Sequence, residues 1–134
     1  AYDFDAFTDL LRVNTLGPVA TLEAFEPHLK KAKGKFAAIS SQLGSIENAM
    51  GFAPAYSTSK AALNKAMKSL AGQFSEAGVA IGPFHPGWVK TDMGGQEAPG
   101  VVENSVAGLR KQIAAMKPTA SPRLVAYNGD VLPW

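Results

Sequence analysis

A tyrosine and a lysine stand four residues apart, Tyr56 and Lys60, where a segment with helical periodicity begins. On a helix such residues project from one face, so the phenol and the ammonium would lie side by side. A tyrosine has a pKa of about 10, and forming its phenolate at pH 7 costs about 4 kcal/mol. An ammonium about 4 Å away, in an effective dielectric of about 20, returns roughly the same free energy. We therefore expect Lys60 to bring Tyr56 toward proton exchange with a substrate oxygen.

The same spacing also occurs on ordinary helices, with a surface lysine and a tyrosine at the core edge. The pair alone favours that structural interpretation, so the surrounding elements must decide between the two. A helix from Tyr56 onward is predicted by apolar residues at three-to-four spacing: Ala61, Leu63, Ala66, Met67 and Leu70.

An earlier helical region is predicted by Phe4, Phe7, Leu10, Leu11, Val19, Leu22, Phe25 and Leu29, with Asp3 or Asp5 as N-cap. Pro18 falls inside it and cannot donate to the carbonyl of Asn14, four residues back. Two interpretations stay open. Either the helix kinks and frees that carbonyl to bind a water, or it breaks near Gly17.

Three short apolar segments predict strands, and helical segments separate them. Lys35 to Ser40 reads as a buried strand after Gly34, and Val79 to Phe84 as a second one, which Pro83 should distort. The last strand is Leu124 to Tyr127. An amphipathic helix is predicted before it by Val102, Val106, Leu109, Ile113 and Met116. Alternation of helix and strand indicates an α/β fold with a parallel sheet and crossover helices.

In open α/β sheets, ligands bind beyond the carboxyl ends of the strands. Ser40 and Ser41 follow the first strand, Tyr56 begins the next helix, and the segment from Pro86 to Thr91 follows the second strand. A carbonyl that accepts a hydride needs a hydrogen-bond donor and a proton at its oxygen. A serine beside a tyrosine provides both. Trp88 and Met93 suggest an apolar substrate side, although Trp88 can equally be a packing residue.

Composition points to one ordinary globular domain, residues 1–134, with 46% hydrophobic and 18% charged residues and a net charge of +2. The cluster Lys30, Lys31, Lys33 and Lys35 has no interleaved aromatic residues, so we read it as a solvated helix end and expect no nucleic-acid partner.

The absence of cysteine excludes disulfides, and His28 and His85 lack metal-site spacing. Without a membrane span or signal peptide, we expect a cytoplasmic protein with no membrane partner. The start at Ala1 rather than Met hints at a missing upstream part.

Four motifs occur in a characteristic order: Asn14, Ile39–Ser41, Tyr56–Lys60 and Pro86–Thr91. Together they resemble the C-terminal half of a classical short-chain dehydrogenase/reductase. The segments Leu43–Ile46, His85–Gly95 and the ending Tyr127–Trp134 resemble its C-factor and carbonyl-reductase-like branch. The resemblance implies a partial Rossmann-like, doubly wound parallel sheet, made of the last three strands with their crossover helices.

The resemblance also implies an NAD(P)-dependent oxidoreductase that interconverts a carbonyl and a secondary alcohol. Tyr56 would be the general acid or base, and Ser41 would hold the substrate oxygen. Lys60 would lower the pKa of Tyr56 and bind the nicotinamide ribose, while Asn14 would hold a water that relays protons to Lys60. The nicotinamide end of the cofactor would be bound by six residues: Tyr56, Lys60, Pro86, Gly87, Val89 and Thr91. The cofactor would be NADP or NAD, with NADP slightly favoured.

The serine assignment has a competitor. Ser41 precedes Tyr56 by fifteen residues, two more than is usual in the family, and Ser45 lies in the loop between them. We prefer Ser41 because its place at a strand end is fixed, whereas Ser45 lies in a glycine-flanked loop.

The family's glycine-rich turn for the cofactor pyrophosphate has no counterpart in this sequence. The first four of the family's seven strands, and with them the N-terminal dinucleotide-binding half, are also without counterpart. We therefore expect the Lys35–Ser40 strand to expose an unpaired edge. We also expect this chain alone to bind NAD(P)H weakly or not at all and to be inactive.

A different class of function is an interaction or signalling fragment that uses its helices as an assembly surface. In the family that the chain resembles, the helices holding Asn14 and Tyr56 commonly pack between subunits, which implies a homo-oligomer. The intact catalytic set favours the enzyme.

Overall fold

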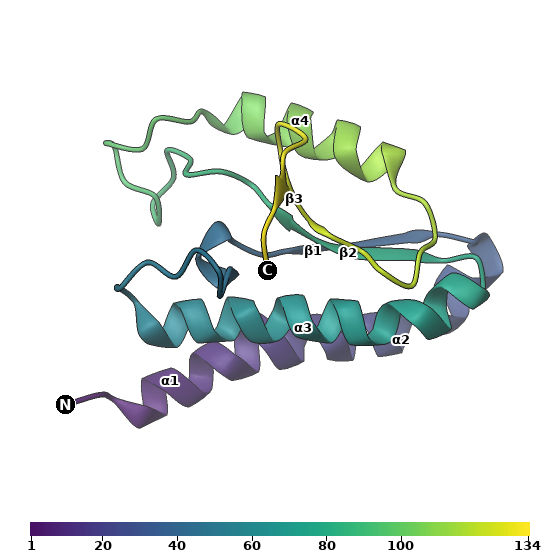
Figure 1. The fold of residues 1–134 in the computed structure, drawn as a ribbon, viewed down its shortest axis with the longest axis horizontal. Coiled ribbons are helices and arrows are strands. Elements are labelled where there is room, and N and C mark those ends of the chain that lie inside the picture. Colours follow the sequence, from purple (N-terminus) through teal and green to yellow (C-terminus); the bar gives the residue numbers. More distant parts are fainter.

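The computed structural model describes residues 1–134 as a four-stranded sheet with helices on both faces (Figure 1). The strands lie in the order β1-β2-β3-β4, with β1, β2 and β3 parallel and β4 antiparallel to β3. Helix α4 covers one face, and α2 and α3 cover the other (Figure 1). The predicted doubly wound α/β class is thereby confirmed.

The elements are α1 (Phe4–Leu11), the π-helical turn η1 (Arg12–Leu16), α2 (Gly17–Ala32), β1 (Lys35–Ile39), the 3-10 turn η2 (Gln42–Gly44), α3 (Pro54–Glu76), β2 (Ala80–His85), α4 (Val102–Ala115), β3 (Leu124–Ala126) and β4 (Val131–Leu132).

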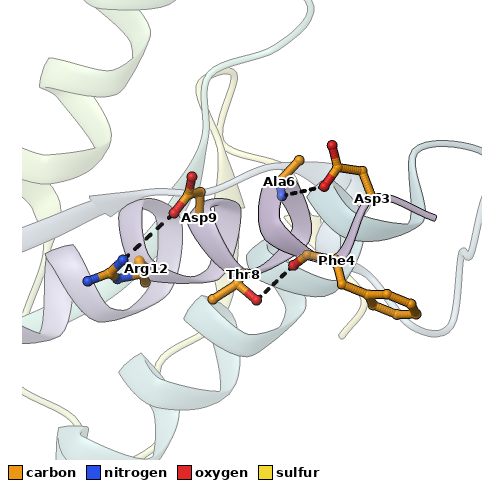
Figure 2. A network of polar contacts seen from close by, with 6 residues as sticks. All are labelled: Asp3, Phe4, Ala6, Thr8, Asp9 and Arg12. Atoms are coloured by element: carbon orange, nitrogen blue, oxygen red, sulfur yellow. Dashed lines mark hydrogen bonds and ion pairs between the residues drawn. The ribbon is translucent and has the colours of Figure 1, made fainter.

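The N-terminus of α1 is capped by Asp3, one of the two predicted candidates. Its Oδ1 accepts the backbone N–H of Ala6 at 3.0 Å, which satisfies one of the orphan donors of the first turn (Figure 2). Thr8 Oγ1 donates to the Phe4 carbonyl at 2.8 Å within the same helix (Figure 2). These local contacts fix where the helix begins.

Pro18 neither ends nor interrupts the helical region. At η1 the Gly17 N–H donates to the carbonyl of Arg12, five residues back, so the turn before the proline is widened. Pro18 then stands in the first turn of α2, where a missing N–H costs little. The interpretation of a break near Gly17 is therefore wrong. The freed Asn14 carbonyl stays a prediction.

The end of α2 carries the lysine cluster, as predicted. Lys30 and Lys31 lie in its last turn, and Lys33 caps it in the left-handed region with φ of 47°. The Gly34 N–H donates to the Leu29 carbonyl at 2.9 Å, which closes the helix before β1 begins. Three of the four lysines thus lie at an exposed helix terminus, whereas Lys35 is exposed at the first position of β1.

Strand β1 is the edge of the sheet, because its only neighbour is β2. The predicted unpaired edge is thus confirmed. The expected burial of this strand is mostly wrong: only Ala38 is buried, and Ile39 is 47% exposed. A strand with one neighbour keeps part of its surface open to solvent.

Pro83 sits in β2 without disturbing it, contrary to the expected distortion. The register with β1 runs unbroken from Lys35 opposite Ala80 to Ile39 opposite Phe84. Backbone groups of successive residues face alternate neighbours, and the Phe84 carbonyl accepts from β1, so the backbone of Pro83 faces β3. Strand β3 pairs only with Phe84 and His85. The missing N–H of Pro83 therefore has no ladder bond to make.

The C-terminal strand β4 is absent from the sequence-based prediction. Strand β3 turns back through Asn128 and Gly129, whose φ is 96°, and the Ala126 N–H donates to the Asp130 carbonyl at 2.8 Å. The predicted last strand and its closing turn are confirmed. Two residues of β4 are too few to show a period.

The core lies between α2, α3 and the sheet. Its fully buried side chains include Leu22, Leu63, Met67 and Phe74. On α4, by contrast, Val102 and Val106 remain 43% and 46% exposed, because this apolar face borders a cleft rather than a packed layer. None of the helices is both long and apolar enough to cross a lipid bilayer.

We expect Met67→Ala to lower the free energy of unfolding by about 2–5 kcal/mol, because it removes buried methylene groups and leaves a cavity. Met67 has no exposed surface, whereas Met93 is 87% exposed. Met93→Ala is therefore the matched control, with an expected change below about 0.5 kcal/mol. Urea unfolding of both variants measures the difference. Equal losses would show that Met67 does not pack in the core.

Candidate active site

A cleft of about 840 Å³ opens at the carboxyl ends of β1 and β2. It is bounded by η2, the first turn of α3, the loop after β2, and α4. The side chains that border it carry hydroxyl, imidazole, amide and apolar groups, and none carries a carboxylate, ammonium or guanidinium. They are Ser40, Ser41, Gln42, Leu43, Met50, Phe52, Tyr56, His85, Pro86, Gly87, Trp88, Val89, Thr91, Met93, Gly94, Val102, Ser105, Val106 and Leu109. The predicted set Ser41, Tyr56, Pro86, Gly87, Val89 and Thr91 thus shares one cleft.

Ser41 is fixed at the start of η2. Its Oγ accepts the Leu43 N–H at 3.1 Å as the N-cap, and its surface is 8% exposed. A hydroxyl that accepts in this way still has its own hydrogen to donate. Ser41 can therefore donate a hydrogen bond to an oxygen in the cleft.

Ser45, the competing serine, is occupied elsewhere. Its Oγ donates to the Trp134 carbonyl at 3.3 Å and accepts the Asn48 N–H at 3.1 Å. It does not border the cleft. Of the two serines, only Ser41 combines a place in the cleft wall with an available donor.

Tyr56 and Lys60 lie on one face of α3, as their spacing predicts. The Lys60 Nζ lies 5.7 Å from the Tyr56 ring centroid and donates to the Ile39 carbonyl at 2.9 Å. Lys60 is 9% exposed and lies behind the cleft wall, which Tyr56 borders. Burial lowers the pKa of Lys60, which opposes the charged form that the predicted effect on Tyr56 requires.

Asn14 reaches α3 rather than the cleft. Its Nδ2 donates to Ser59 Oγ at 3.0 Å, and that hydroxyl donates to the Tyr56 carbonyl at 2.7 Å. The neighbouring Thr15 Oγ1 donates to the Ser59 carbonyl at 2.9 Å. The widened turn η1 is thereby attached to the α3 segment between Tyr56 and Lys60.

Asn64 and Gly44, to which sequence reasoning gave no role in the site, fix the position of η2 against α3. Asn64 Oδ1 accepts from Ser40 Oγ at 2.6 Å, and its Nδ2 donates to the Gly44 carbonyl at 3.3 Å. A Cβ on Gly44 would lie 2.8 Å from the backbone carbon of Lys60, so only glycine lets η2 approach α3 this closely. Asn64 continues the four-residue spacing of Tyr56 and Lys60, and this spacing was an available signal.

His85 is a further missed residue of the cleft wall. It ends β2, is 9% exposed, and its Nδ1 accepts the Gln42 N–H at 3.2 Å. Burial lowers its pKa. His85 has no metal-site spacing in the sequence, and its partner is a backbone N–H, which the sequence does not specify.

The loop after β2 is held by its own backbone. Trp88 Nε1 donates to the Gly94 carbonyl at 2.8 Å, and Thr91 Oγ1 accepts the Gly94 N–H at 3.0 Å. Gly87 has φ of 86°, and a Cβ there would lie 2.8 Å from the Tyr127 ring. Trp88 therefore braces the loop through its indole N–H and borders the cleft, with 56% of its surface exposed.

Comparison with known proteins extends over almost the whole chain. The family model for the short chain dehydrogenases matches residues 1–101. C-signal of Myxococcus xanthus is 38% identical over 133 residues, which are 96% of this chain and 80% of that protein.

The similar solved structures include carbonyl reductases. The carbonyl reductase Sniffer of D. melanogaster is 35% identical and superposes over 100% of this chain with a TM-score of 0.94. The NADPH-bound carbonyl reductase from chicken fatty liver is 32% identical over 99% of this chain, with a TM-score of 0.91. The chain spans 59% of the length of each of these two proteins.

The lowered pKa of His85 predicts a pH-dependent stability. The folded chain binds this proton less readily than the unfolded chain, whose histidine has its ordinary pKa of 6.5. The free energy of unfolding is therefore unaffected by this group above pH 6.5 and falls as the pH drops below it. Thermal unfolding across this range should show a steeper loss in the wild type than in His85→Asn, which cannot titrate. Parallel pH profiles would contradict the assignment.

Proposed function

Because this chain belongs to the short-chain dehydrogenase family, we propose that its protein is an NAD(P)-dependent oxidoreductase that interconverts a carbonyl and a secondary alcohol. Residues 1–134 form, in this proposal, one domain that supplies the catalytic half. The observation that carries it is the cleft that both Ser41 and Tyr56 border, without a charged side chain in its wall.

The two hydroxyls have complementary roles. Ser41 donates a hydrogen bond to the substrate oxygen and so holds the carbonyl in place. In carbonyl reduction, Tyr56 donates its proton to that oxygen as negative charge develops there, and in alcohol oxidation it takes the proton back. The hydroxyl hydrogen of the resulting alcohol is therefore the proton that Tyr56 donated.

The residues at this edge fit the nicotinamide end of the cofactor. The Tyr56 hydroxyl is a donor and an acceptor, and the Lys60 ammonium has two hydrogens beyond its contact with Ile39. These groups suit a ribose diol, and Pro86, Gly87, Val89 and Thr91 offer backbone groups to the ring. When bound, the nicotinamide supplies or accepts the hydride. NADP is the preferred form, since the carbonyl reductase from chicken is an NADPH complex.

Lys60 and Asn14 act from behind the cleft wall. Lys60 spans from the Ile39 carbonyl toward the Tyr56 ring, so it ties the end of β1 to the helix that bears the acid. Asn14 holds the same helix through Ser59. We assign Asn14 and Lys60 to a water-mediated path that returns the proton to Tyr56.

The cleft wall also defines the substrate class. Apart from the hydroxyls it is mostly apolar, with Phe52, Trp88, Met93 and Val106 among its members. A charged substrate would lose its hydration there without gaining a counter-charge. The substrate is therefore an uncharged, apolar aldehyde or ketone, or the matching alcohol.

Apolar side chains on the N-terminal helices point to self-association. Phe4, Val13, Leu16 and Phe25 are between 55% and 73% exposed, all of them on α1, η1 or α2. Large apolar side chains that remain exposed on neighbouring elements are typical of an interaction surface. We propose a homo-oligomer formed through these helices and α3.

A second candidate is a signalling or assembly fragment without catalysis. It is favoured by the printed name of one relative, C-signal, of which this chain covers 80%. The same helices, with their exposed apolar side chains, would then form the functional surface. The enzyme remains preferred because an assembly surface does not require a Ser41–Tyr56 cleft.

Tyr56→Phe in the full-length protein should lower carbonyl reduction at least about 100-fold, because the proton donor is lost while the ring is retained. Cofactor affinity, measured by NADPH fluorescence, should change little. Tyr2→Phe, at a residue 67% exposed on the N-terminal segment, is the matched control. Unchanged turnover in Tyr56→Phe would remove Tyr56 from the mechanism. A Tyr56→Phe variant that loses carbonyl reduction but keeps a signalling activity of the protein would favour the second candidate.

The absence of charge from the cleft wall predicts discrimination between matched ketones. Acetophenone should be reduced with a kcat/KM at least about 100-fold higher than its para-carboxylate derivative, because the carboxylate must be desolvated without a partner. Steady-state kinetics with both compounds measure the ratio. A preference for the carboxylate would contradict the proposed substrate class.

A further inference from the structure

The side chain of His85 continues the contact between β1 and β2 past the end of the backbone ladder. The last ladder bond runs from the Ser40 N–H to the Phe84 carbonyl, at 2.7 Å. Beyond it, β1 ends and the chain turns into η2. There the Gln42 N–H donates to His85 Nδ1 at 3.2 Å, so an imidazole replaces the backbone acceptor.

This contact leaves the first turn of η2 without an orphan donor. The first N–H groups of a helical turn have no partner inside it. The Leu43 N–H is taken by Ser41 Oγ, and the Gln42 N–H is taken by His85. Ser41 is thus held between a ladder bond at Ser40 and an imidazole bond at Gln42.

The hydrogen bond also defines the chemical state of the imidazole. Nδ1 can accept an N–H only through its lone pair, so the ring is neutral with its hydrogen on Nε2. Burial of His85 favours this neutral form. A protonated ring would place an N–H against the Gln42 N–H and lose the contact.

We propose that His85 is a positioning residue, which acts through the Gln42 N–H to hold the Ser41 hydroxyl where it receives the substrate oxygen. This inference rests on the proposed function, in which Ser41 binds that oxygen. His85 needs no contact with the substrate to fulfil the role. What it supplies is an acceptor at the δ position of the side chain.

The matched pair His85→Leu and His85→Asn tests the acceptor directly. Leucine fills similar space without an acceptor, whereas the Oδ1 of asparagine replaces Nδ1. In the full-length protein, kcat/KM for acetophenone should fall at least about tenfold in His85→Leu, because Ser41 is displaced. It should stay within about threefold of the wild type in His85→Asn, and the NADPH affinity should be unchanged in both. His28→Leu, on the exposed surface of α2, is the control.

Amide hydrogen exchange at Gln42 gives a readout that does not need turnover. Exchange should accelerate at least about tenfold in His85→Leu and remain near the wild-type rate in His85→Asn. Should His85→Leu not fold, His85→Gln, with its acceptor one bond too far, takes its place.

The outcomes separate the two claims. A wild type that reduces no uncharged ketone or aldehyde and oxidises no matching alcohol refutes the proposed function, and the exchange data then decide whether His85 positions the loop. Equal exchange in wild type and His85→Leu, or an asparagine variant as impaired as leucine, overturns the role of His85.

Discussion

One face of α3 holds the end of β1, and the geometry of the cleft depends on this contact. Lys60 donates to the Ile39 carbonyl, Asn64 accepts from Ser40, and Gly44 lets η2 lie directly on the helix backbone. Lys60 and Asn64 are one turn apart, and Tyr56 lies one turn before them. The residues that bind the strand end and the residue that borders the cleft thus share one stripe of a single helix.

The second support of the site comes from β2. Its last residue, His85, bonds the start of η2, and the loop that follows is braced by Trp88 and Thr91. The hydroxyls of Ser41 and Tyr56 therefore border a cleft whose surrounding polar groups are largely hydrogen-bonded to one another or to the backbone. The remainder of the wall is mostly apolar, which strengthens each hydrogen bond made inside the cleft.

Periodicity in the sequence predicted the elements that carry the site. The apolar spacing after Tyr56 predicted α3, and the strand-end position of Ser41 placed it at the cleft, whereas Ser45 does not border it. The widened turn at Arg12–Leu16 was not predictable, because a π turn leaves no compositional signal. The tolerance of Pro83 depends on which neighbour its backbone faces, and that follows from the register alone.

The residues near the cleft that sequence reasoning missed have backbone groups among their partners. His85 accepts from a main-chain N–H, and Asn64 bonds a main-chain carbonyl besides Ser40. Residue types and spacings do not specify such partners, since every residue offers the same backbone groups. The proposed catalytic residues Ser41 and Tyr56 could be recognised because their chemistry resides in the side chains themselves.

The central claim is that the cleft at the end of β1 and β2 reduces an apolar carbonyl. The most direct measurement is the balance of the reaction catalysed by the full-length protein, with NADPH consumption and alcohol formation followed together. The account predicts equimolar loss of NADPH and gain of the secondary alcohol. NADPH that binds but is not consumed with any uncharged ketone or aldehyde would contradict it.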